Sequence, residues 1–557
     1  MKPYYTEAEY LGGIPVFLVE IEWGGMIHRM ANFAVTLSSD DGDLNYTGGL
    51  QDFQFKESAD LMGQDLESNL VSLSVIFDDI DLLLEWSKGN VLEGQSANFS
   101  YVIWKEGRVQ QSYENRILLF SGKIQEPQFG DPLDDDGSVS FSIEAEPIDE
   151  NRLLLNNRLF IDQRFGDRDK DTADGKPWPI VLGTPGELVD SDGNTKNLFC
   201  TPAYCIDRYS GVGTYAHFMI AGHQVAASQI VIQDDSFQSV TKPVLEGLDA
   251  NQNVYSYVKI DVFDVIAIPG GPTTGLSAHG TSRSWWVNWD SSTGGGLYNN
   301  YGSGLLENGG DLCRWALNLT GQKIDDGAWA NVAPLLNKYK FSGYINDPDV
   351  GAWEWLAGNI LPFLPVSVRS GPRGLKPVLN QLHAIVLLDP LQSISIGEGE
   401  EFQQITAIET IRSTAELFNK YTLNYGKVGY SQDYSQQCRV SDIKEESWEI
   451  PSDYSILSIN RYGVKESAES SDYIFDISTA NSIALQKVRS NSLPVRSLGI
   501  SAKFHYGYFQ IGDIIEVTSS RLYLTKQKML IAEKEWSGSE WIFTLIFEDN
   551  PIQNKRS

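Results

Sequence analysis

The sequence is poor in cysteine, histidine and basic residues, and each shortage argues against a class of protein. Four cysteines in 557 residues do not supply the disulfide framework of a small secreted domain. No window approaches the roughly 18 consecutive apolar residues that a membrane-spanning helix needs. The chain has 43 basic against 74 acidic residues, a formal net charge of −31. A surface with this charge repels phosphate, which argues against a protein that grips a nucleic-acid backbone.

The sequence also lacks a recognisable targeting signal and the common catalytic motifs. MKPYYTEAEYLGG has neither a basic region nor an apolar run, so we expect no signal peptide and synthesis in the cytoplasm. G-x-S-x-G, H-E-x-x-H, a P-loop and a helix-opening G-x-G-x-x-G are missing from the sequence. Acidic residues are so numerous that pairs at hydrolase spacing would arise anyway. We predict that the chain is not an enzyme and has no catalytic or cofactor-binding residue.

Two short segments have a residue spacing close to that of a known type of metal site. Cys200, Cys205, His217 and His223 have a spacing near that of a zinc finger. The residues between them lack the apolar pair of a finger, and a strand-like FMIAG stretch separates the histidines. We interpret the four as free thiols and ordinary histidines and predict no metal, with zinc as the alternative.

The second of these segments is acidic. Asp167, Asp169 and Asp171 have the spacing of the first ligands of a calcium loop, but Thr172 and Trp178 occupy the positions of the expected Gly and Glu. We interpret this segment as a solvated acidic loop.

What the sequence has in abundance is glycine and aromatic residues, with 50 Gly, 25 Tyr and 14 Trp. This composition favours a mainly β, loop-rich architecture. The length predicts three to four domains.

Alternating apolar residues predict a small strand-and-turn module near each end of the chain. In SVSFSIEAE, Val139, Phe141, Ile143 and Ala145 face inward, and IPVFLVEIEW (14–23) has the same period of two. Near the C-terminus, residues 506–549 are interpreted as four short strands, which end on alternating Trp541, Phe543, Leu545 and Phe547. We interpret both modules as parts of small β-barrels.

Helical periodicity is concentrated between residues 310 and 365. DLCRWALNL and DVGAWEWLAGNIL place apolar residues at i, i+3, i+4 and i+7, with Asp311 and Asp349 as predicted N-caps. Pro334 predicts that the helix in NVAPLLNKY begins at the proline. Two further helices are predicted at 401–421 and 478–490.

These patterns divide the chain into six predicted segments. They are a first β-barrel domain (1–150), a connector (151–187), a β-rich and loop-rich variable domain (188–305), two α+β domains (306–400 and 401–490), and closing β-barrel strands completed by earlier segments (491–557). Within the variable domain, Trp285, Trp286 and Trp289 are either a sugar-stacking platform or a cluster packed within the domain or against a neighbouring subunit.

Four stretches, taken in order, resemble the tail hub (baseplate hub) family of long-tailed bacteriophages and gene transfer agents. They also resemble the N-terminal part of lambda-like tail-tip attachment proteins. The stretches are LNYTGGLQDFQFKES with LFSGKIQEPQFG and VSFSIEAEPID; PWPIVLGTPG; DLCRWALNL with FSGYINDPDVGAWEWLAGNIL and GLKPVL; and SLGISAKFHYGYFQIGDIIEVTSS with MLIAEKEW. They span most of the chain and leave roughly 190–300 as the least typical part.

The resemblance implies a structural virion protein at the tail tip. Hubs of this family are trimers at the end of the tail tube, in which two small barrels per subunit let a three-fold ring seat on a six-fold one. The implied partners are the distal tail protein and tail tube ring, the tape measure protein, tail fibre or tip proteins, the host cell surface, and double-stranded DNA that passes without specific binding. The alternatives are a carbohydrate-binding tail adhesin and an acidic β-rich hydrolase.

The resemblance also suggests a use for the negative charge. Because basic walls would trap passing DNA, we expect much of the excess acid to line an axial channel, with the turn Asp131–Asp136 as the candidate. The alternative is that these aspartates form a solvated loop on the outer rim.

Overall fold

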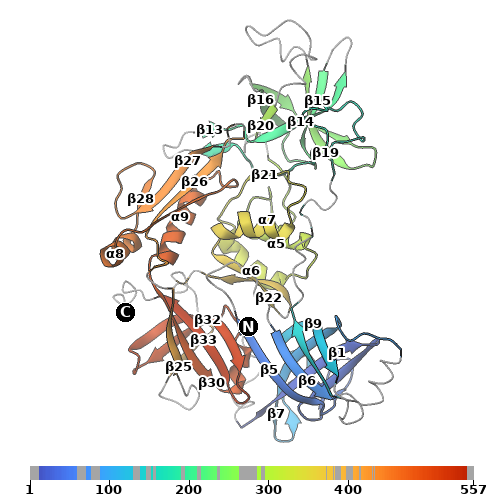
Figure 1. Cartoon of the computed structure of the whole chain (residues 1–557), viewed down its shortest axis with the longest axis vertical. Helices are drawn as coiled ribbons and strands as arrows, with labels where there is room; N and C mark the ends of the chain where they lie inside the picture. The colour runs from blue at the N-terminus through green and yellow to red at the C-terminus, as the bar shows by residue number, and fades with distance from the viewer. Residues whose placement is uncertain are drawn as a thin grey trace.

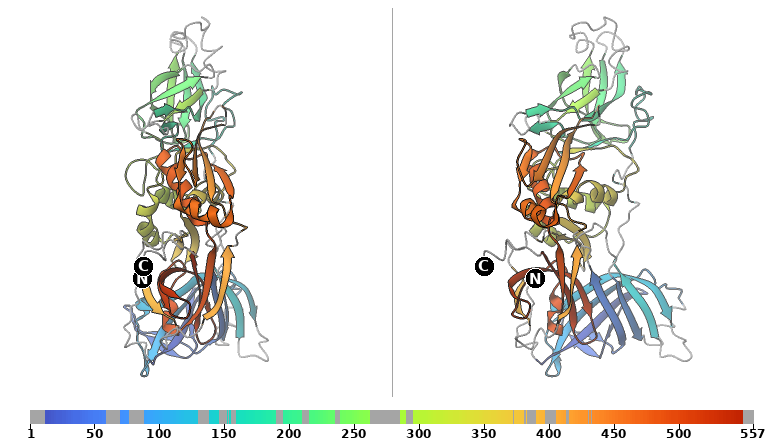
Figure 2. Two further views of the ribbon diagram at one scale, coloured as in Figure 1. Left: turned by 90° about the vertical axis from the view of Figure 1, so that its left-hand side faces the viewer. Right: turned by 60° about the vertical axis from the view of Figure 1, so that its left-hand side comes forward.

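The two ends of the chain lie together at one pole of an elongated molecule, as the blue and red strands of Figure 1 show. The computed structural model describes residues 12–58, 70–76, 88–129, 138–145, 152, 154, 159–189, 195–209, 215–234, 239–261, 285–289, 295–371, 373–380, 382, 390–396, 405–412, 415–429, 431 and 433–548. A sheet forms this pole, a layer of helices and short sheets lies above it, and a strand-rich distal part forms the other pole (Figures 1 and 2). The predicted mainly β, multi-domain fold is confirmed.

The N-terminal part is a curved antiparallel sheet. Its strands, in spatial order, are β2 (Met26–Ala31), β1 (Ile14–Trp23), β7 (Ser96–Lys105), β9 (Ile117–Phe129), β10 (Ser138–Glu144), β6 (Leu70–Ile76) and β5 (Leu50–Ser58). A small hairpin and a short strand accompany them, namely β3 (Val35–Leu37), β4 (Leu44–Tyr46) and β8 (Arg108–Val109). Val139, Phe141 and Ile143 of β10 are buried, as the alternation predicted.

The C-terminal part continues the same sheet. Its strands are β32 (Leu524–Trp536), β33 (Trp541–Glu548), β30 (Val495–Ala502) and β25 (Ile405–Arg412), with β31 (Ile514–Ser519) between β32 and β24 (Gln392–Ser395). Three strands and a short 3₁₀ helix (Phe504–Tyr508) replace the four strands predicted for residues 506–549. Trp541, Phe543 and Leu545 are fully buried, whereas Phe547 is only partly buried.

The predicted helix at 401–421 is wrong. Its described residues contain β25, which pairs with β30 along the sheet, and the beginning of β26 (Lys420–Lys427). The sequence ITAIETIR is rich in β-branched residues, which fit a pleated surface, and the pairing with β30 overrides a local helical pattern.

The N-terminal and C-terminal parts are joined by one pair of strands. β5 pairs with β32, with Glu57 opposite Lys534 and Ser58 opposite Glu533. One hydrophobic core lies beneath both parts, where the ring of Phe55 is 5.6 Å from that of Trp541. The two strand-and-turn modules predicted near the ends of the sequence therefore form one continuous sheet in space.

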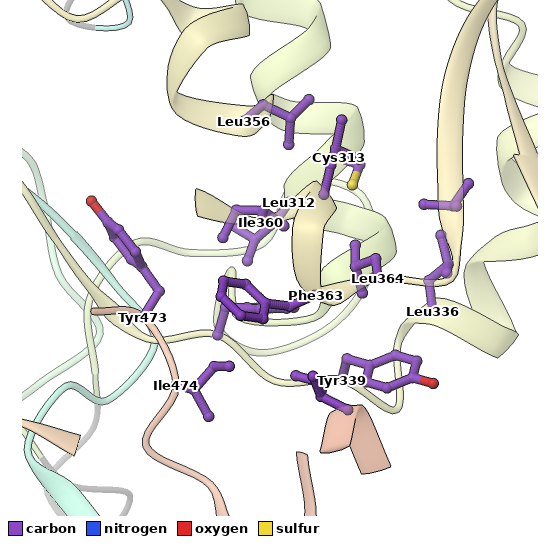
Figure 3. Packing of buried hydrophobic residues seen from close by; sticks show 14 of the residues in the cluster. Leu312, Cys313, Leu336, Tyr339, Leu356, Ile360, Phe363, Leu364, Tyr473 and Ile474 are labelled. Carbon is purple, nitrogen blue, oxygen red and sulfur yellow. The ribbon is translucent and has the colours of Figure 1, made fainter. Parts of the chain in front are cut away.

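The middle layer contains α5 (Gly309–Leu319), α6 (Asp326–Leu336), α7 (Ala352–Asn359) and the hairpin β22 (Val366–Gly371) and β23 (Gly374–Leu379). Their buried side chains form one cluster with residues from the C-terminal third of the chain. Figure 3 shows Phe363 between Ile360 and Ile474, with Tyr339 and Tyr473 at either side.

The helices exist as predicted, but their beginnings differ. Asn308 and Gly351 are the N-cap residues of α5 and α7, in place of Asp311 and Asp349. The Asp311 carboxylate instead accepts a hydrogen bond of 2.8 Å from Asn299, and the backbone of Gly310 donates to Asn337. Tertiary contacts thus set where α5 begins.

The proline prediction for α6 was also wrong. The helix begins after Asp325, whose side chain accepts from the Ala328 backbone, and it passes through Pro334. Pro334 has no N–H to donate to the carbonyl of Ala330, and only two helical residues follow it, so this loss lies near the C-terminal end of the helix.

A four-stranded sheet and two helices form the remainder of the middle layer. The strands are β28 (Glu449–Pro451), β27 (Tyr434–Ser441), β26 and β29 (Glu466–Ser470), and the helices are α8 (Asp453–Tyr462) and α9 (Ile477–Asn491). α9 confirms the helix predicted at 478–490. The Asp476 side chain caps it by accepting from the Thr479 backbone at 2.7 Å.

The distal part is a seven-stranded sheet. In spatial order its strands are β17 (Ser239–Pro243), β16 (Gln229–Asp234), β20 (Trp285–Asn288), β14 (Thr201–Tyr209), β15 (Tyr215–Ala221), β19 (Val254–Asp261) and β18 (Leu245–Leu248). Two small sheets link it to the middle layer, β11 (Ile180–Leu182) with β21 (Gly343–Ile345) and β12 (Glu187–Val189) with β13 (Thr195–Asn197). Among the described helices, none is long and apolar enough to cross a membrane.

Candidate functional site

Buried charges lie where the two parts of the large sheet meet the middle layer. We call Glu57, Arg369, Lys376, Asp513 and Lys534 the junction cluster. Glu57, Arg369, Lys376 and Lys534 are each at most 7% exposed. The Arg369 guanidinium lies 3.9 Å from the Glu57 carboxylate and donates to the Ser58 carbonyl. The Lys376 ammonium donates to the Gln510 side chain at 3.1 Å. The cluster thus ties β5, β32 and the β22–β23 hairpin together.

Lys534 is the most enclosed cation of the junction cluster. Its ammonium donates to the Gly507 carbonyl and lies 4.5 Å from the centre of the Trp541 ring and 5.5 Å from that of Phe55. Burial lowers the pKa of Lys534 to about 8, against the opposing attraction of Glu57. Burial lowers the pKa of Lys376 as well.

The lowered pKa of Lys534 predicts a rise in stability at alkaline pH. The folded protein releases this proton near pH 8, whereas the unfolded chain holds it until about pH 10.4. In that window the unfolded state binds more protons, so the free energy of unfolding should rise, by about 1–3 kcal/mol. We expect wild type to gain this much relative to Lys534→Met between pH 7.5 and 10, measured by urea denaturation.

A matched control is Lys444→Met, because Lys444 is exposed. Its stability should follow the wild-type curve at every pH. Parallel curves for wild type and Lys534→Met would contradict the assignment, since they would show that Lys534 does not titrate differently in the two states.

The main run of strands in the large sheet ends in β2 and β25, which have a single described neighbour each, as do the side strands β8 and β24. β2 pairs with β1 and β25 pairs with β30, at opposite ends of the strand order. Both carry exposed apolar side chains, with Met26 48%, Ile27 51% and Ile408 55% exposed. Strand edges of this kind are usually covered by another chain or protected by charge. They are the candidate assembly surface of the molecule.

A hollow lies beside the β25 edge. It has a volume of about 270 Å³ and is lined in part by Ile408, Leu522, Leu524 and Phe547. At its rim, Tyr523 is 94% exposed and adopts a φ of 55°, a conformation that is costly for a bulky residue. The turn between β31 and β32 therefore presents an aromatic side chain to solvent next to a hollow that is lined by both apolar and polar residues.

The two cysteines and two histidines with zinc-finger-like spacing each contact a different part of the protein. The Cys200 thiol donates to the Lys427 carbonyl at 3.1 Å. The Cys205 thiol contacts the Asp207 carbonyl, and burial raises its pKa to about 11. His223 accepts from the Val181 backbone, and His217 lies 3.7 Å from Asp207. No group of three or more His, Cys, Asp or Glu side chains among the described residues is placed to hold a metal ion.

The acidic segment after residue 166 is not simply solvated. Asp169 is only 3% exposed, accepts from the backbones of Asp171 and Thr172 and pairs with Arg208 of β14. The Asp169 carboxylate therefore stabilises the turn to which it belongs and attaches this turn to the distal sheet. The reading of this residue as part of a solvated loop is corrected.

The tryptophans in β20 and directly after it do not form an exposed platform. Trp285 and Trp289 are 2% and 0% exposed, and the Trp289 indole donates to Thr201 at 2.7 Å. Trp286 packs on Gly429, where an added Cβ would lie 2.7 Å from its ring. These side chains hold the distal sheet together and dock it on the middle layer, and the stacking platform is excluded for the two buried rings.

The junction cluster was missed by the sequence analysis, although a signal for it exists. Lys534 lies two residues from Ala532 and two from Trp536 on β32, and Glu57 lies two residues from Phe55 on β5. The period of two therefore predicts an inward position for both charged residues. A charged residue at an inward position of a strand is rarely buried without a partner. Two such residues on separate strands indicate a buried pair.

Comparison with known proteins gives only distant matches. No family model and no curated protein matches the sequence. Among solved structures, the 43 kDa tail protein of prophage MuSo2 from Shewanella oneidensis aligns at 10% identity and a TM-score of 0.36, over 95% of this chain and 98% of that one. A tail protein from Neisseria meningitidis MC58 aligns at 11% and 0.35, over 96% and 97%.

A chain of the virion of a native gene transfer agent particle aligns at 13% identity and a TM-score of 0.18, over 52% of this chain and 85% of that one. At these scores the matches do not establish a shared fold, and no function is drawn from them.

Proposed function

We propose that this chain is the structural tail hub of a tailed bacteriophage. In this role, three copies close the distal end of the tail tube and connect it to the tail tip or fibre. The observation that carries the proposal is the continuous sheet built from both ends of the chain, which leaves β2 and β25 as edges at its two extremes. The order of the hub-like sequence stretches supports the same role.

The two edges explain why copies should associate. A contact between the β2 edge of one copy and the β25 edge of the next is heterologous, and such contacts form a ring if the rotation closes. Three copies, each with two curved sheet parts, would present six parts to a six-fold tail ring. In this role the partners are the distal tail protein, the tail tube ring, the tape measure protein and tail fibre or tip proteins.

We expect the purified full-length protein to form a trimer. Its mass in solution at micromolar concentration should be about three times the 62.1 kDa of the chain, because a ring covers every copy of both edges. Light scattering coupled to size exclusion measures it, and low-resolution imaging should show a three-fold ring. A stable monomer under all conditions, with no ring form, would count heavily against the hub.

The alternatives predict different behaviour of the isolated chain. An adhesin would bind glycans and a hydrolase would release sugars or peptides, whereas a hub should do neither. Cleavage of peptidoglycan, capsule or peptide that a single carboxylate substitution abolishes would favour the hydrolase.

The acidic turn Asp131–Asp136, proposed for a DNA channel, lies outside the described residues. The sign of the electrostatic potential along the axis of a trimer tests whether acidic residues line such a channel.

A further inference from the structure

A basic pocket lies between the N-terminal sheet and the middle layer. Its volume is about 200 Å³, and its walls come from β9, from the loop between α5 and α6 and from the turn between β22 and β23. Each of these three segments contributes one cation, namely Lys123, Lys323 and Arg373. Serine hydroxyls from β7, β9 and β22 add polar groups to the walls.

The charge of the basic pocket contrasts with that of the chain. Acidic residues outnumber basic ones by 74 to 43, yet no carboxylate is among the described residues that line this pocket. The Lys123 ammonium is held at the wall by a hydrogen bond of 2.9 Å to Ser96. Lys323 and Arg373 are exposed. Three positively charged residues in the walls of one concavity attract an anion.

Backbone contacts fix the walls of the basic pocket. Gly374 has a φ of +119°, and a Cβ there would lie 2.3 Å from the Lys323 carbonyl. The Leu375 backbone donates to that same carbonyl at 2.8 Å. On the opposite wall, a Cβ at Gly122 would lie 1.9 Å from the Glu144 carbonyl. Gly374 thus lets the loop that carries Lys323 lie against the β22–β23 turn, and Gly122 lets β9 lie against the end of β10.

We propose that the basic pocket binds a phosphate group. An arginine fork and two lysine ammonium groups are the side chains that most often hold this anion. A volume of about 200 Å³ accommodates a phosphate group, and the negative charge of the surrounding molecule repels a long polyanion. The bound group is therefore inorganic phosphate or the terminal phosphate of a short nucleic-acid strand. This inference does not depend on the hub proposal.

The test is isothermal titration of the full-length protein with sodium phosphate, with chloride used to keep the ionic strength constant. We expect saturable binding at one site per chain. Lys323→Gln and Arg373→Gln should each weaken it roughly tenfold or more, since each removes a charge-assisted hydrogen bond. Both residues are exposed, so their replacement should leave the thermal melting curve unchanged. Lys444→Gln, at an exposed lysine elsewhere, should bind phosphate like wild type.

A second titration distinguishes the two sources of phosphate. A thymidine hexamer that carries a 5′ phosphate should compete with inorganic phosphate if a strand terminus is the ligand, and the same hexamer without it should not. Competition by neither hexamer would assign the pocket to free phosphate. The proposal is overturned if wild type shows no saturable binding, or if binding is unchanged in both the Lys323 and the Arg373 variants.

Discussion

Replacement of Phe543 by alanine is expected to lower the free energy of unfolding by about 3–5 kcal/mol, the usual cost of truncating a buried aromatic residue. The ring of Phe543 is fully buried, 5.5 Å from the ring of Phe509. Its strand lies between β30 and β32, so the cavity would open inside the core that both ends of the chain share. A shift of the urea midpoint, followed by circular dichroism, measures the loss.

The matched control is Tyr523→Ala. Tyr523 is an aromatic residue of the same C-terminal part but is 94% exposed, and exposed substitutions usually change stability by less than about 0.5 kcal/mol. If the Phe543→Ala protein is soluble, assembles normally and has unchanged stability, then this face of β33 is not part of the core.

Replacement of Glu57 by glutamine should cost a similar amount, for an electrostatic reason. Glu57 faces Arg369, and its charge also acts on Lys376 and Lys534. Removing one partner from a buried charge group leaves the opposite charges uncompensated, which typically costs 3–5 kcal/mol. We expect Glu57→Gln to lower the urea midpoint by a corresponding amount at pH 7.

Two further variants separate this effect from a general weakness of the junction. Glu535→Gln alters an exposed carboxylate of the same strand pair and should be nearly neutral. Lys534→Met removes the most enclosed cation, so adding it to Glu57→Gln should restore part of the lost stability. Equal stability of Glu57→Gln and wild type would show that the carboxylate does not balance the buried cations.

The sequence predicted the elements whose signals are local. The alternation of Val139, Phe141 and Ile143 has the period of a strand with one buried face, and these residues are buried. The helix predicted at 478–490 is present as α9, and the Asp476 side chain that caps it lies within one turn of its start. In both cases the residues that decide the structure are neighbours in the sequence.

Features decided by distant residues could not be predicted in this way. Gly309 and Gly310 begin α5 because Tyr339 and Asn337 accept their backbone hydrogen bonds, and nothing near Asp311 encodes this. The strand β25 depends on its pairing with β30. The basic pocket collects cations from three segments that are between 50 and 250 residues apart, so its charge is not visible as a run in the sequence.

The pairing of β5 with β32 sets an order of events during synthesis. Residues 56–58 leave the ribosome long before their partners at 533–535, and at 5–20 residues per second the delay is roughly 25–95 s. During that time the β5 edge and the aromatic face beneath it have no native partner. Such an edge is a site for mispairing with other nascent chains. The yield of native protein should therefore depend on chaperones that hold the N-terminal sheet until its last strands arrive.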